Sequence, residues 1–174
     1  MIIKINNCYP KIGKNTWISE TSTIIGDVEI GNDCSIWFGA VIRGDIHFIR
    51  IGNRTNIQDL CVIHVTAEEK TDSFSSFPVV IGNDVTIGHK AMIHGCTISD
   101  ACLIGMNAIL QDGCKIGSES IVGAGSLVTK NCKFPPRSMI FGSPAKLIRE
   151  LTDQEIAFIY ESSEHYIDYM NMYK

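Results

Sequence analysis

The sequence lacks any long apolar run. No stretch approaches the roughly 20 consecutive apolar residues that a membrane-spanning helix needs, although 45% of the 174 residues are hydrophobic. The first residues, MIIKINNCYPKIGKNTW, also contain no apolar segment long enough for a signal peptide. These absences predict a cytoplasmic protein without a membrane segment. They leave the apolar residues to build the core of one domain.

An excess of positive charge is missing too. Fifteen Lys and Arg residues stand against nineteen Asp and Glu residues, which gives a net charge of −4. Proteins that bind nucleic acid or anionic membranes need basic patches that neutralise phosphate groups. We therefore expect neither partner.

The cysteine motifs of disulfide-linked and thiolate-metal proteins are absent. The seven cysteines are an odd number, lie well apart and form no CxxC motif. A disulfide framework or a thiolate zinc site would show regular or closely spaced pairs. The sequence predicts reduced thiols.

What the sequence does contain is a repeat of six residues. An aliphatic or aromatic residue recurs at this spacing, which is neither the helical period nor the alternation of a simple strand. The run is interrupted after Ile42, Ile63 and Ile93. The repeating positions are Ile12, Ile18, Ile24, Ile30, Ile36, Ile42, Ile51, Ile57, Ile63, Ile81, Ile87, Ile93, Ile98, Ile104, Leu110, Ile116, Val122, Val128, Phe134 and Ile140.

A small residue often stands four places after the aliphatic one. Five cysteines occupy this slot (Cys34, Cys61, Cys102, Cys114 and Cys132), so we interpret them as small buried hydrophobic residues. Such a hexapeptide pattern is typical of a parallel β-helix. It resembles the left-handed β-helices of the hexapeptide family, which form triangular prisms with three six-residue faces per coil. The resemblance implies an all-β fold, a left-handed parallel β-helix of about six to seven coils, over residues 1–148.

The repeat is interrupted in two places. Residues 66–77 (TAEEKTDSFSSF) are polar and aperiodic, which predicts a loop that protrudes from the coil. Near the C-terminus, Thr152 and Glu155 have the spacing of a capping box and predict a helix over 152–172. We expect this helix to pack on the prism or on a neighbour with one face, made of Ile156, Ile159, Tyr160, Ser163, Ile167 and Met170.

Three of the five histidines gather in the central coils. His64 follows Ile63 directly and His94 follows Ile93 directly, so both occupy the same slot of the repeat. The 30 residues between them, less the 12 of the predicted loop, leave 18, which is one coil. Their side chains should therefore stack on one face, where they can share one metal ion.

His89 occupies a different position of the repeat. It stands two places after Ile87, about one face away from the other two histidines. Three histidines and a water are a known catalytic zinc set, so this register predicts that His89 reaches the ion from a neighbouring subunit.

The motifs around these histidines resemble those of the γ-class carbonic anhydrase-like family. The resemblance covers nearly the whole chain and rests on SIWFGAVIRGD (35–45), IG (51–52), TNIQD (55–59), VIHVT (62–66), IGH (87–89), IHGC (93–96) and GSPAK (142–146). It implies a homotrimer with metal ions at the subunit interfaces, normally zinc, with iron or cobalt as alternatives. The implied reaction is the reversible hydration of carbon dioxide to bicarbonate by metal-bound hydroxide.

The resemblance also implies roles for further residues. Arg43 and Asp45 would form a salt bridge at the subunit interface, with Asp59 near Arg43. Gln58 and Asn56 match polar residues that lie beside the metal in the family. Tyr160, on the predicted helix, is a candidate for a supporting contact with the site.

The chain departs from the pattern of the archetypal enzymes. A glutamate of their proton path is replaced by Ile46, and Glu68 and Glu69 in the loop are the remaining candidates for that task. His47 and His165 are interpreted as surface residues. Two other functions stay open: a hexapeptide acyltransferase or acyl-coenzyme A thioesterase, and a metal-binding trimer without catalytic activity.

Overall fold

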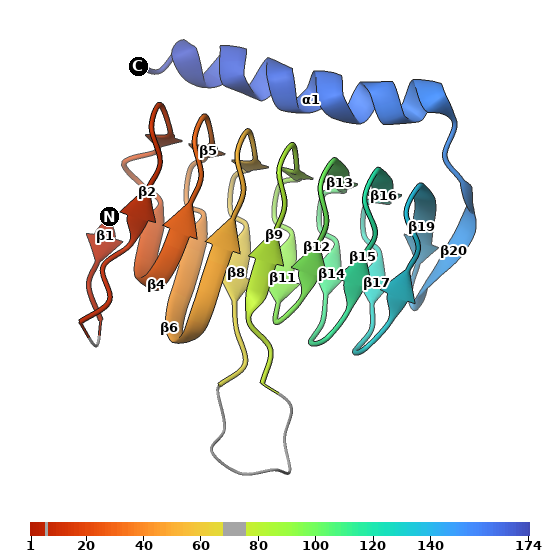
Figure 1. Cartoon of the computed structure of the whole chain (residues 1–174), viewed down its shortest axis with the longest axis horizontal. Helices are drawn as coiled ribbons and strands as arrows, with labels where there is room; N and C mark the ends of the chain where they lie inside the picture. The colour runs from red at the N-terminus through yellow and green to blue at the C-terminus, as the bar shows by residue number, and fades with distance from the viewer. Residues whose placement is uncertain (6, 68–75) are drawn as a thin grey trace.

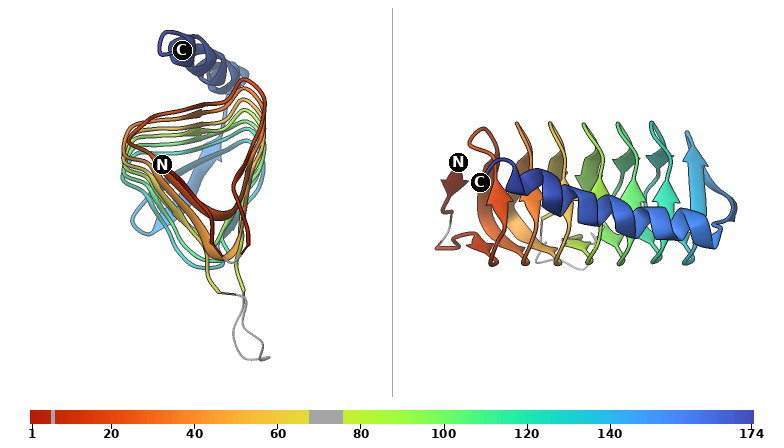
Figure 2. Two further views of the ribbon diagram at one scale, coloured as in Figure 1. Left: turned by 90° about the vertical axis from the view of Figure 1, so that its left-hand side faces the viewer. Right: turned by 90° about the horizontal axis from the view of Figure 1, so that it is seen from above.

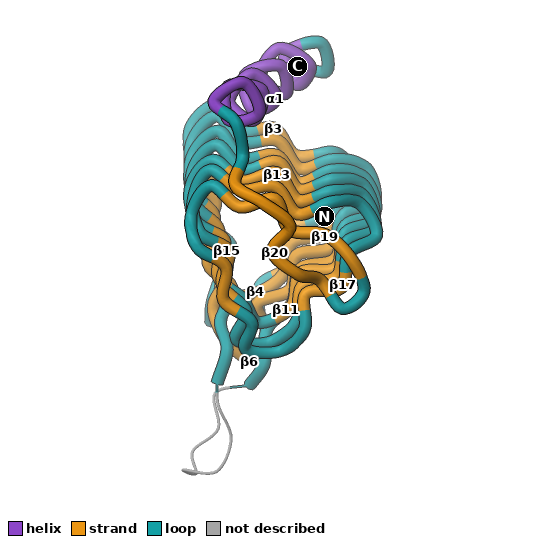
Figure 3. The backbone as a smooth tube through the Cα atoms, turned by 90° about the vertical axis from the view of Figure 1, so that its right-hand side faces the viewer, coloured by secondary structure: helices purple, strands orange, loops and turns teal. Residues whose placement is uncertain are grey.

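The computed structural model describes residues 1–5, 7–67 and 76–174 and shows a left-handed parallel β-helix with one α-helix along its side (Figure 1). The prism has a triangular cross-section, which is visible along its axis in Figures 2 and 3. Every strand pair is parallel except the last, β19 with β20, which forms an antiparallel hairpin at the C-terminal end of the prism. The predicted fold class is confirmed.

One face carries His64 and His94 on its outer side, and we call it the histidine face. The strands confined to it are β1 (Ile2–Ile3), β8 (Val62–His64), β11 (Met92–His94), β14 (Ile109–Leu110) and β17 (Leu127–Val128).

The second face carries many charged residues, and we call it the charged face. Its strands are β2 (Lys11–Ile12), β9 (Val79–Ile81), β12 (Thr97–Ile98), β15 (Lys115–Ile116) and β18 (Lys133–Phe134). Two long strands, β4 (Thr23–Ile30) and β6 (Val41–Ile51), bend around the corner and belong to both this face and the histidine face.

The third face is covered by the α-helix, and we call it the helix face. Its strands are β3 (Trp17–Ile18), β5 (Ser35–Ile36), β7 (Asn56–Ile57), β10 (Thr86–Ile87), β13 (Cys102–Ile104), β16 (Ser120–Val122), β19 (Ser138–Gly142) and β20 (Ala145–Glu150).

The six-residue repeat builds the interior of the prism. Seventeen of its twenty positions are buried, and the other three, Ile12, Ile18 and Phe134, pack against the same core. The cysteines of the small slot join them: Cys34, Cys61, Cys102 and Cys114 are buried, and Cys132 is partly buried. Burial raises the pKa of the Cys102 thiol to about 12, which keeps it protonated and inert.

The shifts in the repeat have local causes. Between the paired positions Gly26–Gly44 and Val28–Ile49, β4 advances two residues while β6 advances five, so β6 holds three extra residues at its corner. The second interruption of the repeat falls at the predicted loop, whose ends Thr66 and Phe77 form an antiparallel bridge. The middle of that loop, 68–75, lies outside the described residues, and so do Glu68 and Glu69.

The C-terminal helix, α1 (Asp153–Asn171), begins where the sequence predicts. Thr152 is its N-cap, and the capping box with Glu155 is present. Ile156 and Ile159 pack on the outer side of the helix face against Ala101, with Leu103, Ile121 and Met139 around them. The helix runs back along the prism, so that the C-terminus lies beside the N-terminal coils (Figures 1 and 2). No helix of the described residues has the length and hydropathy to cross a membrane.

Candidate metal centre

His64 and His94 lie side by side on the histidine face, as their positions in the repeat predict. Strands β8 and β11 pair in register, with His94 directly opposite His64. The Nδ1 atom of His64 is 3.2 Å from the Nε2 atom of His94. Zn–N bonds of about 2.0–2.1 Å in a tetrahedral site leave ligand nitrogens a little over 3 Å apart, so this pair of nitrogens fits one ion.

The other nitrogen of each of these rings faces a carboxylate. His64 Nε2 is 3.0 Å from Asp45 Oδ1, and His94 Nδ1 is 2.6 Å from Asp112 Oδ1. Such partners fix the tautomer and orientation of a metal-binding imidazole. The two nitrogens that face each other, His64 Nδ1 and His94 Nε2, are therefore the ones that contact no carboxylate.

The predicted salt bridge between Arg43 and Asp45 is present within one chain. Burial alone would raise the pKa of Asp45, but hydrogen bonds from Arg43 and His64 outweigh it and hold that pKa below its ordinary value. Burial lowers the pKa of His64, although Asp45 opposes the shift. Both pKa shifts favour an ionised Asp45 carboxylate beside a neutral His64 imidazole, which is the form that binds a metal.

His89 stands at the corner that follows β10, apart from the other two histidines. Its Nδ1 atom is 2.8 Å from Asp59 Oδ2, and 44% of its side chain is exposed. Within the described residues of one chain, no three His, Cys, Asp or Glu side chains form a metal-binding group. Asp59 pairs here with His89, so the predicted proximity of Asp59 to Arg43 stays a prediction for two neighbouring chains.

Gln58 and Asn56 lie on the helix face next to His89. Both side chains are buried. The Gln58 Oε1 atom accepts a hydrogen bond from the backbone N–H of His89 at 3.2 Å, and its amide nitrogen donates to Asn56 Oδ1. Asn56 also donates to Thr86, whose hydroxyl bonds Ser162 of α1. In one chain, these residues support His89 rather than His64 and His94.

The tyrosine that lies near His89 is not the one that the sequence suggests. The phenol of Tyr160 lies near Glu119 and Asp84, and burial, followed by these charges, raises its pKa. Tyr166 and Tyr169 instead line a cavity of about 290 Å³ together with Asp59 and His89. Trp37, Phe38, Met172 and Tyr173 complete its wall. The spacing of Tyr166, Tyr169 and Tyr173 predicts that these three tyrosines share one side of the helix. It does not predict where along the prism the helix lies.

Apolar side chains are exposed beside the histidines. On the histidine face, Met92 and Ile109 are 37% and 41% exposed. Leu60 and Met106, in the turns that lead to β8 and β14, and Phe141 of β19 are exposed as well. Met92 and Ile109 border a cavity of about 380 Å³ next to His94, whose other walls are Leu110, Gln111, Asp112 and Lys130. This surface has the apolar character of an interface between proteins.

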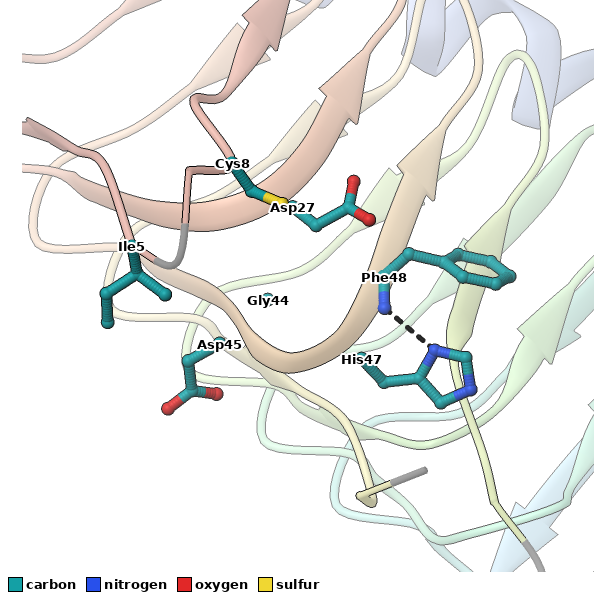
Figure 4. Close-up of a pocket in the computed structure, with 7 residues that line it drawn as sticks. All are labelled: Ile5, Cys8, Asp27, Gly44, Asp45, His47 and Phe48. Carbon is teal, nitrogen blue, oxygen red and sulfur yellow. Dashed lines mark hydrogen bonds between the residues drawn. The ribbon is translucent and has the colours of Figure 1, made fainter. Parts of the chain in front are cut away.

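A third cavity, of about 260 Å³, borders Asp45 (Figure 4). Its walls are Ile5, Cys8, Asp27, Gly44, Asp45, His47 and Phe48. The His47 ring accepts a hydrogen bond from the backbone N–H of Phe48 and lies away from Asp45 in Figure 4. Ile46 between them is exposed and brings no proton-carrying group to this corner.

Two family profiles match the chain. "Bacterial transferase hexapeptide (six repeats)" matches residues 9–44 and 95–130, and "Hexapeptide repeat of succinyl-transferase" matches residues 78–111. Both describe the repeat that forms the prism.

Curated relatives match almost the whole chain. A protein of Methanocaldococcus jannaschii named "Probable carbonic anhydrase" is 53% identical over 156 residues, which are 90% of this chain and 93% of that protein. "Gamma carbonic anhydrase 2, mitochondrial" of Arabidopsis thaliana is 42% identical over 91% of this chain, which spans only 56% of the plant protein. A solved structure of a hexapeptide transferase family protein from Anaplasma phagocytophilum has a TM-score of 0.92 and 35% identity, and the match covers 100% of this chain and 98% of that one.

Proposed function

Because this chain belongs to the γ-class carbonic anhydrase-like family of hexapeptide-repeat proteins, we propose that it is a metal-dependent enzyme that hydrates carbon dioxide to bicarbonate. The observation that carries the proposal is the facing pair of ring nitrogens of His64 and His94, 3.2 Å apart, with a carboxylate behind each ring. We expect zinc to occupy this site, and iron or cobalt would also accept three imidazoles.

The third ligand comes from a neighbouring subunit of a homotrimer. His89 has its Nδ1 atom on Asp59, which leaves its Nε2 atom for the metal. Its side chain is 44% exposed at an edge of the prism, so it can reach across to a second chain. The exposed Met92 and Ile109 beside His94 support contact with that chain, because burying them would stabilise the assembly.

The residues of the chain divide the work between binding and orientation. Asp45 orients His64, and Arg43 balances the charge of Asp45. Gln58 and Asp59 hold the backbone and ring of His89. The apolar side chains of Met92 and Ile109 next to His94 suit carbon dioxide, which has no charge and needs no hydrogen-bond donor. When bound, the metal supplies a Lewis acid that makes water nucleophilic near neutral pH.

A subunit-mixing experiment tests both the site and the trimer. His64→Ala and His89→Ala should each lower metal retention and stopped-flow carbon dioxide hydration by more than roughly 100-fold, because each removes a direct ligand. Trimers that contain both variants should regain intact sites wherever His89 of one chain meets His64 of the other. Random mixing should restore about a quarter of the sites.

The outcomes separate the candidate functions. Absence of activity in mixed trimers would show that the three histidines do not meet across chains. A wild-type trimer that binds metal without hydrating carbon dioxide would favour the non-catalytic role. The hexapeptide transferase profiles make an enzyme that acts on acyl-coenzyme A the main alternative. Hydrolysis or transfer of acyl-coenzyme A substrates would identify that class if His89→Ala abolished the reaction.

A further inference from the structure

Asp112 lies one coil beyond His94 and outside the motifs on which the resemblance to the family rests. Its Oδ1 atom is 2.6 Å from His94 Nδ1, and its side chain is only 24% exposed. This is the shortest of the three contacts between a carboxylate and a histidine at the candidate site, since the Asp59 and Asp45 contacts measure 2.8 and 3.0 Å.

The corner that carries Asp112 is one residue longer than the corner that follows His94. Ile93 pairs with Leu110, and Ile98 pairs with Ile116. Four residues lie between Ile93 and Ile98, whereas five lie between Leu110 and Ile116. Gly95 and Gly113 remain aligned by a backbone hydrogen bond. The additional residue lies before Gly113, where Asp112 can bend back toward His94.

The previous coil leaves room for this carboxylate. Gly95 has a φ of +53°, and a Cβ atom on it would lie 2.4 Å from Asp112 Oδ1. The same Cβ atom would lie 2.8 Å from the Cβ atom of Phe77, and one on Gly113 would lie 2.8 Å from the ring of Phe77. The two glycines therefore leave room for Asp112 beside His94 and for Phe77 against both turns.

The geometry excludes Asp112 as a ligand of the same ion. It contacts Nδ1 of His94, whereas Nε2 of that ring faces His64. Asp45 on His64 Nε2 and Asp59 on His89 Nδ1 stand in the same relation to their rings. Each of the three histidines thus has one nitrogen on a carboxylate of its own chain and a second nitrogen that no carboxylate contacts.

We propose that Asp112 is a positioning residue that fixes the orientation and tautomer of His94, so that the ring binds the metal through Nε2. This inference rests on the proposed metal site and assigns to it a residue from a third coil. The assignment implies that metal affinity depends on the length of the 110–116 corner as well as on the three histidines. Removing a carboxylate behind a metal-binding histidine weakens metal affinity by roughly 10–100-fold.

The test measures metal binding rather than turnover. For the wild-type trimer, Asp112→Asn and Asp112→Ala, zinc affinity is measured by competition with a chelator, and the visible absorption of bound Co²⁺ reports the ligand geometry. We expect Asp112→Ala to weaken affinity by roughly 10–100-fold and to change the Co²⁺ spectrum. Asp112→Asn should retain part of the affinity, because the amide oxygen still accepts a hydrogen bond from Nδ1.

Gln111→Ala is the matched control. Gln111 borders the same cavity, but its side chain bonds the backbone of Lys130 and not His94. It should bind zinc as the wild type does. Wild-type affinity and an unchanged Co²⁺ spectrum in Asp112→Asn and Asp112→Ala would overturn the inference. If Asp112→Ala does not assemble, the test rests on Asp112→Asn. A zinc affinity of Asp112→Asn within twofold of wild type would then refute the proposed role. A wild-type trimer that binds no metal would instead refute the proposed function itself.

Discussion

The histidine face and the helix face share one interior and have different exteriors. Ile93 and Ile87 point inward from neighbouring strands of the same coil, and neither is exposed to solvent. On the outside, Thr86 and Asn56 are buried beneath α1, whereas Met92 and Ile109 on the histidine face are exposed. The repeat therefore specifies the prism, and the outward residues specify what covers each face.

This difference is what we would expect if the proposed metal site is completed by a second chain. The helix face is covered by the chain's own C-terminal segment, with Ile156 and Ile159 buried on it. The described residues provide no such cover for Met92 and Ile109, which stay exposed next to His64 and His94, and no third candidate ligand joins this pair within one chain. We infer that the first face is completed within the chain and the second by assembly.

Removing a core side chain should have the largest effect on stability, and the loss should be the same for the histidine face and the helix face. Ile87→Ala and Ile93→Ala each remove a fully buried side chain from the prism, which costs about 2–5 kcal/mol through lost burial and the cavity left behind. Denaturant unfolding of both variants at one protein concentration measures these costs. Val80→Ala, at an outward position of the charged face, is the control and should change stability by less than about 0.5 kcal/mol. A difference of several kcal/mol between the two core variants would contradict a common interior.

A smaller effect should separate the two faces. Ile109→Glu places a charge in the exposed apolar surface of the histidine face and should weaken trimer assembly by about 2 kcal/mol, roughly 30-fold. Light scattering over a dilution series measures the association. Val80→Glu puts the same charge at an exposed outward position of the charged face and should leave the oligomeric state unchanged. Equal trimer stability in both variants would show that the histidine face is not the interface.

The interior of the prism could be predicted from the sequence because its cause is local. Each hexad buries one aliphatic side chain, so the burial of Ile87 or Ile93 follows from spacing alone. The capping box at Thr152 also depends on residues three apart. The alignment of His64 with His94 required only that the length of the predicted loop be subtracted from their separation.

The rest of the site could not be predicted, because it depends on contacts between coils. The contact of Asp112 with His94 arises from one additional residue in a later corner and from the missing side chain of Gly95. The position of Tyr166 near His89, and of Tyr160 near Glu119, depends on where α1 docks along the prism. Periodicity shows which side of a helix is apolar, but it gives no axial position.

The smallest expected effect is a pH dependence of stability that arises at the start of α1, the helix that covers the helix face. Glu155 accepts hydrogen bonds from Arg149 at 2.7 and 2.8 Å and from the backbone of Thr152, and Arg149, followed by Thr152, lowers its pKa from 4.5 to about 2. Because the folded pKa is lowered, the stabilisation is fully present above pH 4.5 and is lost as the pH falls toward 2. The group is exposed, so salt should screen the effect.

Thermal unfolding of wild type and Glu155→Gln between pH 6 and pH 2.5 measures this contribution. The wild type should unfold at the higher temperature at pH 6, and the difference should shrink below pH 4.5, because protonation removes the negative charge that the variant lacks throughout. Asp168→Asn, on an exposed part of the same helix, should show no comparable loss with acid. A difference that stays constant down to pH 2.5 would mean that the charge of Glu155 does not hold α1 on the helix face, and that apolar packing by Ile156 and Ile159 suffices to cover it.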